Sequence, residues 1–392
     1  MKDSSAVRLC IVTTTRADWG LLLPVARELS KRDDVKIDVV AGNMHLLERY
    51  GHTIDEITAS GFDIAGRIPC DVEGDSDASR VLAMAKAMQG AAEVFDRLRP
   101  DAVLLLGDRY EMLAIASAAA TMHLPIIHIA GGEISEGALD DCYRHAITKL
   151  STLHLTATEE YRRRVMQLGE DPSRVVNTGA IGVWNAFNIP LLSADELGAW
   201  LGIDFDGRKV ASVTFHPATN DSASPREQVK ALTAALAQFP DMIQVISFPN
   251  NDAGGESIIP VLEEYAAAHP GNVRAVSSLG MVRYQSLLHI ANVVIGNSSS
   301  GIVEAPSAGA VTVDVGVRQK GRMAADSVIH CEPTETAIRE AIGKALSPEY
   351  QQLAAKKENP YYKPDTLRLM TEAITDFLHS LPVPSKKFYD LC

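Results

Sequence analysis

Short apolar runs alternate with amphipathic stretches along nearly the whole chain. Residues 7–13, 35–41 and 102–106 have the length and the apolar side chains of buried strands, and residues 20–31 and 79–99 carry apolar positions at helical spacing. Ordered alternation of strands and helices is typical of a parallel sheet with helices on both faces. The pattern therefore predicts an α/β fold.

The alternation is interrupted at residues 189–208, a stretch with a proline and several glycines that we interpret as a loop-rich connection, and it restarts at residues 210–215. Single hydrophobic cores rarely grow beyond about 250–300 residues. Two successive doubly wound Rossmann-like domains are therefore the simplest interpretation. We expect an N-terminal domain over residues 1–188, a C-terminal domain over 189–364, and a helix and tail over 365–392 that can pack back on the first domain.

Composition narrows the choice of partners. The chain has 50 Asp and Glu against 37 Lys and Arg, a net charge of −13, which disfavours nucleic acid or an anionic membrane as a general partner. The apolar region 113–130 is broken by His123 and Pro125, so no membrane span is expected. Five scattered cysteines form no CxxC pair. We expect a cytoplasmic protein without a disulfide framework or a zinc site.

Three common cofactor and metal signatures are absent from the sequence. There is no GxGxxG after a strand, no GxxxxGK[ST] and no HExxH. A nicotinamide cofactor, a P-loop nucleotide and a zinc protease site are therefore poorly supported.

Ionisable residues follow two neighbouring predicted strands, residues 102–106 and 125–130. Ligands bind beyond the carboxyl ends of strands in open α/β sheets, so these residues are candidates for one shared site. A solvated surface pair is the alternative for any two of them. The residues are Asp108, Arg109, Glu133, Asp140, Asp141, Arg144 and His145.

Single basic residues follow other strands. Arg16 comes at the end of the first strand and could clamp phosphate through its planar fork, although a surface ion pair is an equal alternative. His45 ends the second strand, and His216 ends the first strand of the second domain. A lone histidine is more often structural than catalytic. Two at strand ends, one in each domain, strengthen the functional interpretation.

The second domain carries a serine-rich turn in the segment IGNSSSGIVEAPSAG, residues 295–309. Ser298 and Ser299 can be helix caps, or can bind an anion together with free backbone N–H groups. We expect a helix from near Gly301, with Glu304 in its first turn, where it either reaches a sugar hydroxyl or stabilises the helix dipole. Asn250 in a polar turn and Arg318 in a basic loop are further candidates.

The motifs in their order resemble one family, over nearly the whole chain. They are TRADWG, GDR, HIxGGE, DDxxRHAITKL, FHP, PNNDAG, GNSSxGIxEAP and VGxRQxGR. Together they resemble the hydrolysing nucleotide-sugar 2-epimerases of the UDP-N-acetylglucosamine 2-epimerase family, which feed sialic-acid-type pathways. Residues 156–175 and the EGALDD block look most like the legionaminic-acid branch, the N,N'-diacetylbacillosamine 2-epimerases.

The resemblance implies a GT-B-like architecture, two Rossmann-like domains with the active site in the cleft between them, and a homodimer or higher homo-oligomer. It also implies no metal and no redox cofactor, and we therefore expect none. It implies that a UDP- or GDP-linked 2,4-diacetamido-2,4,6-trideoxyglucose is converted to the free mannose-configured sugar and the nucleoside diphosphate. The nearest alternative is the same reaction on UDP-N-acetylglucosamine, giving N-acetylmannosamine. A GT-B glycosyltransferase or a non-catalytic sugar-nucleotide binder are further alternatives.

Residue roles follow from the resemblance by motif. Asp108 and Asp140 match the proton carriers, and Arg144 holds a carboxylate or a phosphate. His216 is expected near the diphosphate and Glu304 at the ribose. Matches to substrate and phosphate binders are Arg16, His45, Arg109, Asn250, Ser298, Ser299 and Arg318.

One position departs from the sialic-acid enzymes, which carry a catalytic Glu in HIEGGE where this chain has Ala130. Either Glu133 or His128 takes over the proton transfer, or Ala130 makes room for the 4-acetamido and 6-deoxy groups of the sugar.

Overall fold

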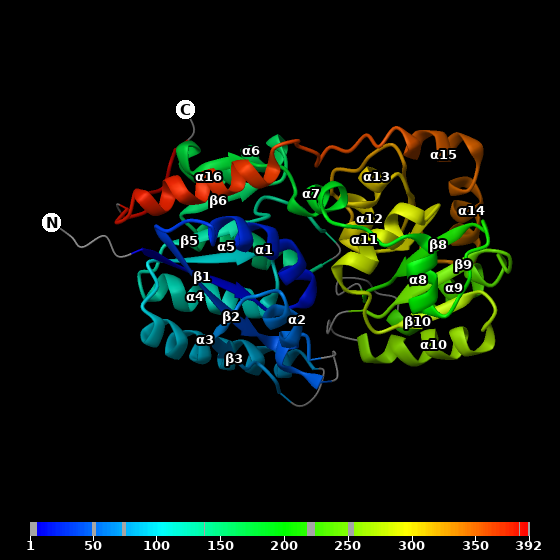
Figure 1. The fold of residues 1–392 in the computed structure, drawn as a ribbon, viewed down its shortest axis with the longest axis horizontal. Coiled ribbons are helices and arrows are strands. Elements are labelled where there is room, and N and C mark those ends of the chain that lie inside the picture. The colour runs from blue at the N-terminus through cyan, green and yellow to red at the C-terminus, as the bar shows by residue number, and fades with distance from the viewer. Residues whose placement is uncertain are drawn as a thin grey trace. The chain divides into compact units, whose positions relative to one another are not determined.

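The computed structural model describes residues 6–48, 52–72, 76–136, 138–217, 224–249, 255–383 and 385–390. Its strands form two parallel sheets, shown in Figure 1. The first sheet has the strand order β3-β2-β1-β4-β5-β6-β7. These strands are β1 (Val7–Thr13), β2 (Val35–Gly42), β3 (Ile64–Ile68), β4 (Ala102–Leu106), β5 (Ile126–Ile129), β6 (Leu153–Thr156) and β7 (Val175–Asn177).

The second sheet repeats the same winding. Its order is β10-β9-β8-β11-β12-β13, and all its pairs are parallel. In each sheet the strand order reverses beside the first strand, which creates a topological switch point. The strands are β8 (Val210–Thr214), β9 (Ile243–Ser247), β10 (Val273–Val276), β11 (Val293–Gly296), β12 (Val311–Val315) and β13 (Val328–Cys331).

Helices connect the strands of each sheet. Those before β8 are α1 (Arg16–Leu29), α2 (Ile54–Ala59), α3 (Asp77–Leu98), α4 (Tyr110–Thr121), α5 (Asp140–Leu150), α6 (Glu159–Gln167), α7 (Ile181–Asn188) and α8 (Ala194–Leu201), with the 3-10 turns η1 (Asn43–Leu46) and η3 (Pro172–Arg174). Those after β8 are α9 (Pro225–Leu236), α10 (Gly255–Ala268), α11 (Gly280–Ile290), α12 (Ser299–Val303), α13 (Ala305–Ala308), α14 (Glu335–Ala345), α15 (Pro348–Ala355) and α16 (Thr366–His379).

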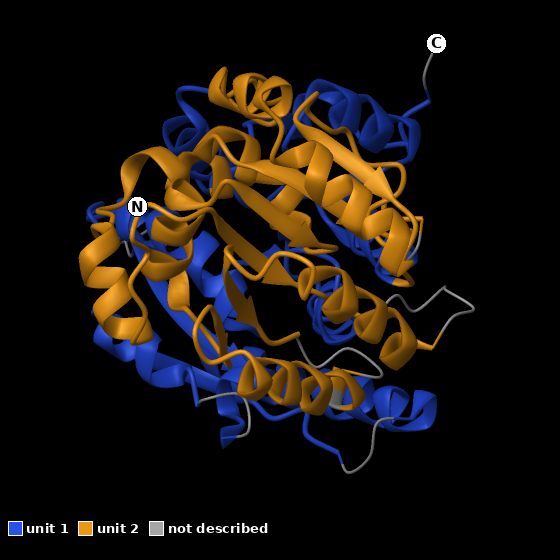
Figure 2. Cartoon of the chain, turned by 90° about the vertical axis from the view of Figure 1, so that its right-hand side faces the viewer, with its two compact units in different colours: residues 1–133, 140–181, 363–392 blue, residues 134–139, 182–362 orange. Residues whose placement is uncertain are grey.

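The chain divides into two compact units, coloured in Figure 2. The first unit comprises residues 1–133, 140–181 and 363–392, and the second comprises 134–139 and 182–362. Helix α16 belongs to the first unit and packs against α1 and β6. Its buried side chains include Met370, Ile374 and Phe377. Residues 363–392 thus belong to the same unit as residues 1–133.

Each unit has its own apolar core around its central strands. In the first unit Val12, Val103 and Ile126 come from three different strands of one cluster and are fully buried. In the second unit Val213 and Val313 play the same part. Burial on both faces explains why these strands are continuous apolar runs in the sequence. The predicted α/β class with two doubly wound sheets is confirmed.

One local prediction needs a correction. The stretch 189–208, interpreted as loop-rich, also contains α8, which starts with a capping box between Ser193 and Glu196 and ends at Gly202 in the left-handed region. In the described ranges no helix is both long and apolar enough to cross a membrane.

Candidate functional site

A buried arginine organises the polar residues at the carboxyl ends of β4 and β5. Arg144 lies on α5 and is 1% exposed. Its Nη2 donates to Oδ2 of Asp108, which follows β4, and its Nη1 donates to Oδ1 of Asp141 at 3.1 Å and to the backbone carbonyl of Glu133 at 2.9 Å. Four of the sequence candidates, Asp108, Glu133, Asp141 and Arg144, therefore lie together, Glu133 through its backbone carbonyl.

The first turns of α5 supply Asp141 and Arg144 to this cluster, because residues three or four apart lie on one face of a helix. Asp140 is the first residue of α5 and Asp141 the second, where carboxylates favour the positive end of the helix dipole. Asp140 is half-buried. Arg144 forms an ion pair with Asp141, three residues earlier. The sequence analysis named Asp141 as a candidate for the shared site without assigning it a partner, and its partner is Arg144.

His128 is held away from proton transfer. It is fully buried on β5, with Nε2 2.8 Å from the carbonyl of Gly107 and Nδ1 3.2 Å from Oγ1 of Thr148. A carbonyl only accepts, so Nε2 carries the hydrogen and Nδ1 accepts from the threonine hydroxyl. Burial lowers the pKa of His128 to about 4. With both nitrogens engaged, this ring is a structural bridge between β5, β4 and α5.

The turn after β5 has a constrained backbone. Ala130 has φ of 69°, a left-handed conformation that non-glycine residues rarely adopt. Gly132 has φ of 80°, and a Cβ there would lie 2.4 Å from the carbonyl oxygen of Tyr161. The second glycine of HIAGGE is therefore required by a close approach of α6, and the turn carries the half-buried Ala130 and the buried Glu133 into fixed positions.

A second acidic group of the first unit was missed by the sequence interpretation. Glu111 on α4 is fully buried, and its Oε1 accepts from Nε of Arg109 at 2.8 Å and from Nδ2 of Asn43 at 2.7 Å. Asn43 itself has φ of 45°. A carboxylate near the start of the apolar helix YEMLAIASAAAT was the available signal, since buried acids need partners.

The first strand ends beside this group. Thr15 caps α1 in a capping box with Asp18, and Oδ2 of Asp18 accepts from Oγ1 of Thr14 and the N–H of Thr15, both at 3.1 Å. Burial raises the pKa of Asp18 to about 6, against the opposing charge of Arg109. Arg16, the expected phosphate clamp, is the half-buried first residue of α1.

His45 has a position unlike that of a direct ligand contact. Its ring is fully buried, with Nε2 3.0 Å from Oγ1 of Thr13 and Nδ1 2.8 Å from Oγ1 of Thr53. Burial lowers its pKa to about 4. The neutral ring ties the end of β1 to the segment after β2, so it shapes the strand ends.

In the second unit an asparagine links two of the predicted residues. The amide of Asn297, directly after β11, accepts from the N–H of His216 at 2.6 Å and donates to the carbonyl of His216 at 2.8 Å. The carbonyl of Asn297 accepts from Nη1 of Arg318 at 3.2 Å and from Nε2 of Gln319 at 2.8 Å. Asn297 is 1% exposed and was not selected from the sequence. It brings His216 and Arg318 to one strand-end cluster.

The serine turn lies next to Asn297. Ser298 is the N-cap residue of α12 but makes no side-chain capping hydrogen bond. Its Oγ lies 3.1 Å from Oγ of Ser300, which in turn bonds the hydroxyl of Tyr284. Burial raises the pKa of Tyr284. Ser299 is the first residue of α12. The turn is thus lined with neutral hydroxyl donors.

Glu304 lies elsewhere than predicted. It follows the last residue of α12 and is the N-cap residue of α13, where its side chain makes no capping hydrogen bond, so it does not lie in the first turn of the predicted helix. Its Oε2 accepts from Nε2 of Gln285 at 2.6 Å, and a Cβ at Gly182 would lie 2.5 Å from Oε1. Burial raises its pKa to about 7, and the bond from Gln285 opposes that shift. The carboxyl group is held against the backbone of α7.

Two predictions concern absent features or undescribed residues. Asn250 lies outside the described residues. Within the described ranges, no group of three or more His, Cys, Asp or Glu residues is arranged to hold a metal ion.

Comparison with known proteins places these strand-end clusters in context. The family model described as UDP-N-acetylglucosamine 2-epimerase matches residues 27–375. The chain belongs to this family. The family model spans both units, including the Asp108–Arg144 cluster and the Asn297 cluster. The resemblance stated from the motifs is therefore confirmed.

Two relatives in this epimerase family carry closely related names. The chain is 34% identical to a GDP/UDP-N,N'-diacetylbacillosamine 2-epimerase (hydrolyzing) from Campylobacter jejuni, over 88% of this chain and 89% of that protein. It is 37% identical to a UDP-N,N'-diacetylbacillosamine 2-epimerase (hydrolyzing) from Legionella pneumophila, over 87% and 89%. The chain is accordingly an enzyme of the hydrolysing 2-epimerase type.

A solved structure supports the fold class. The crystal structure of a Neisseria meningitidis UDP-GlcNAc 2-epimerase bound to UDP-GlcNAc has a TM-score of 0.78, covering 94% of this chain and 100% of that one, at 18% identity. The GT-B-like class expected for the epimerase is confirmed at the level of the fold.

Proposed function

We propose that the enzyme converts a UDP- or GDP-linked 2,4-diacetamido-2,4,6-trideoxyglucose to free 2,4-diacetamido-2,4,6-trideoxymannose and the nucleoside diphosphate. The observation that carries the proton chemistry is the buried Arg144 between Asp108 and Asp141, with Glu133 beside it. The two diacetylbacillosamine relatives support the choice of sugar.

The reaction needs more than one proton carrier. Removal of the C2 proton and departure of the diphosphate break the C2–H and C1–O bonds and leave a glycal. Addition of water at C1 and of a proton at C2 on the other face then gives the free inverted sugar. The C2 proton is not activated by a carbonyl group, so a base must be positioned for it. Carboxyl groups in different surroundings can divide the base and acid roles.

We assign these roles within the first unit. Asp108 and Asp140 are the leading proton carriers, and Arg144 fixes the carboxylate of Asp108. Of the two candidates to replace the family Glu, His128 has both ring nitrogens engaged. Glu133 is therefore the proposed replacement.

Residues of the second unit suit the diphosphate and ribose. His216 and Arg318 share Asn297, and Ser298 and Ser299 begin α12 beside them. Imidazole, guanidinium and hydroxyl groups are donors for phosphate oxygens. Glu304 is the proposed ribose contact. We propose Arg16 and Arg109 from the first unit as further contacts, with His45 holding the strand ends in place. That both units serve one site stays a prediction.

Ala130 is the proposed specificity position. It sits half-buried on the constrained turn after β5, one residue past the strand. A methyl group leaves space that a longer side chain would fill. The 4-acetamido group of the proposed sugar is larger than the hydroxyl of N-acetylglucosamine, which fits a small residue here.

The test is a comparison of UDP-linked diacetamido sugar and UDP-N-acetylglucosamine as substrates, followed by release of UDP. We expect kcat/KM for the diacetamido sugar to exceed that for N-acetylglucosamine by at least about a hundredfold, the scale on which a shaped pocket discriminates. Equal or reversed values would identify the enzyme as a UDP-N-acetylglucosamine 2-epimerase, the alternative that the family description favours. GDP-linked sugar in parallel decides the nucleotide.

The proposal extends to the biological setting. A free diacetamido mannose is the sugar that legionaminic-type nonulosonic acid synthesis consumes, and we propose this pathway. The described cysteines Cys10, Cys70, Cys142 and Cys331 are free, which fits the expected cytoplasmic location. A homodimer or higher homo-oligomer stays a prediction.

A further inference from the structure

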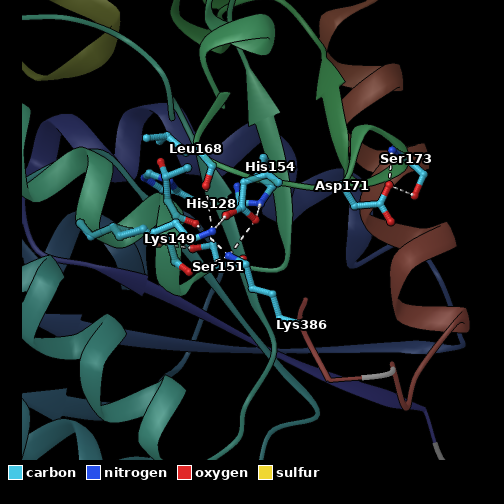
Figure 3. Close-up of polar contacts among 11 residues, drawn as sticks. His128, Lys149, Ser151, His154, Leu168, Asp171, Ser173 and Lys386 are labelled. Carbon is cyan, nitrogen blue, oxygen red and sulfur yellow. Dashed lines mark hydrogen bonds and ion pairs between the residues drawn. The ribbon is translucent and has the colours of Figure 1, made fainter. Parts of the chain in front are cut away.

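The C-terminal tail carries a lysine that caps the helix of the candidate site. The ammonium group of Lys386 donates to the carbonyls of Lys149 and Ser151, each at 2.6 Å, and lies 3.4 Å from the carbonyl of Thr148. These carbonyls are at the end of α5, where Figure 3 shows Lys386 reaching them. The last carbonyls of a helix lack partners within it, and a cation there also complements the dipole.

A buried carboxylate fixes the same ammonium group from the other side. Glu170 is 2% exposed and accepts from Lys149 at 2.7 Å, from Nε2 of His154 at 3.0 Å and from Lys386 at 2.7 Å. Burial alone would raise the pKa of Glu170, but the three donors outweigh it and lower the pKa to about 2. The carboxylate is therefore ionised, and the ammonium of Lys386 is one of three donors to a buried charge.

The tail is also held by its backbone and its aromatic ring. The N–H of Tyr389 donates to the carbonyl of Gly169 at 2.9 Å. The ring of Phe388 lies over Gly169, where a Cβ would come within 2.4 Å of it, and its centroid is 5.0 Å from the ammonium of Lys149. Residues 386–389 of the tail thus have a defined binding position on the first unit.

Two sets of contacts connect the position of Lys386 to Asp108, one of the proposed proton carriers. Thr148, in the capped turn, bonds Nδ1 of His128 at 3.2 Å, and Nε2 of His128 bonds the carbonyl of Gly107 at 2.8 Å. Gly107 directly precedes Asp108. The second set runs through α5 itself, since Arg144 lies one turn before Thr148 and pairs with Asp108.

We propose that Lys386 is a positioning residue, which holds the end of α5 and the His128 bridge and thereby sets the geometry of the Asp108–Arg144 pair. It acts through these groups and contacts none of the atoms that react. The inference rests on the proposed function of Asp108, and it gives the tail a role in turnover rather than in folding alone.

The test compares Lys386→Met with Lys387→Met, a neighbouring exposed lysine that lies outside this network. We expect Lys386→Met to lower kcat per folded enzyme by about tenfold, the effect of a small misplacement of catalytic groups, with KM little changed. Lys386→Arg keeps a donor at the carbonyls and should restore part of kcat. Lys387→Met should match wild type. A merely structural role would lower the folded fraction and leave the kcat of the folded protein unchanged.

A second readout does not depend on activity. The ¹⁵N resonances of the His128 imidazole report its two hydrogen bonds, and we expect them to shift in Lys386→Met and to stay in Lys387→Met. Wild-type kcat in Lys386→Met, or a lowered kcat with unmoved His128 resonances, would overturn the positioning role. If wild type releases no nucleoside diphosphate from either sugar, the proposed function fails, and the His128 resonances still decide whether Lys386 positions the bridge.

Discussion

The sheets of the two units share their winding over six strands, and the first sheet adds β7, but the units differ in the residues at their strand ends. In the first unit acids surround guanidinium groups, as Asp108 and Asp141 surround Arg144 and Glu111 holds Arg109. In the second unit a neutral amide, Asn297, and hydroxyl groups lie beside His216 and Arg318. Paired carboxylates suit proton transfer, and neutral and cationic donors suit an anion. We therefore propose that one winding supports two tasks through the residues that follow its strands.

The largest effect on activity should come from changing a carboxylate of the first unit. Asp108→Asn keeps the shape and a contact to Arg144 but cannot exchange a proton, so kcat should fall by roughly a thousandfold. Affinity for UDP should stay near wild type, because the second unit is assigned to the nucleotide. Steady-state kinetics and calorimetric titration with UDP measure the two quantities.

The control for this change is Asp96→Asn on α3, an exposed carboxylate paired with Arg99 at 2.8 Å. It should leave both quantities unchanged. Wild-type kcat in Asp108→Asn, or a loss of UDP affinity as large as the loss of kcat, would contradict the assignment of proton transfer to the first unit and of the nucleotide to the second.

The second prediction concerns nucleotide binding by the second unit. Asn297→Ala leaves both peptide groups of His216 without their side-chain partner, which costs about 1–3 kcal/mol per unsatisfied buried group. We expect UDP affinity to fall by about tenfold to a hundredfold, because His216 loses the amide that aligns it. Calorimetric titration measures it.

Asn272→Ala is the matched control, because its amide also bonds a backbone carbonyl, that of Met242 at 3.0 Å, but precedes β10 at the amino end of the strand. It should lower stability without lowering UDP affinity. Equal losses of affinity in both variants would show that Asn297 acts on stability alone.

The third prediction concerns substrate choice at the turn after β5. Ala130→Glu should lower kcat/KM for the diacetamido sugar by about tenfold or more, because the added carboxylate fills the proposed space. Ala130→Gly keeps that space and suits φ of 69°, so it should retain activity. Competition kinetics with both sugars check this, and an unchanged or improved rate in Ala130→Glu would contradict the space-filling role.

The smallest effect is a pH dependence of stability in the second unit. Burial raises the pKa of Glu304 to about 7, above its ordinary value of 4.5. The protonated carboxyl is favoured in the folded state, so its contribution is full below pH 4.5 and is lost as the pH rises through 7. Wild type should therefore lose about 1–3 kcal/mol relative to Glu304→Gln between pH 4.5 and 8 in denaturant unfolding. A constant difference between the two proteins would show that the carboxyl titrates normally.

Buried central strands were easier to predict than the edge strands β3 and β13. Strands β1 and β4 match the predicted bounds, residues 7–13 and 102–106, and β4 is a continuous apolar run because it is buried on both faces. The edge strands β3 and β13 contain half-buried or exposed positions, which interrupt such a run. Helix α8 was not predicted, because Gly198 lies within it and Gly202 ends it, and glycines are typical of loops.

The site shows the same division. Charged residues that directly follow strands, such as Asp108 after β4, could be grouped from the sequence because parallel strands end at one edge. Residues that act through another residue were missed, because nothing in the local sequence says what Glu111 or Asn297 will contact. The position of Glu304 was mistaken because the break between α12 and α13 depends on packing.

The central claim is proton exchange at C2 coupled to loss of the nucleotide. Incubation of wild type with the UDP-linked diacetamido sugar in heavy water, followed by NMR, tests it directly. The account predicts free mannose-configured sugar that carries deuterium at C2, together with UDP. Intact nucleotide sugar, or a free sugar that keeps its original hydrogen at C2, would contradict it.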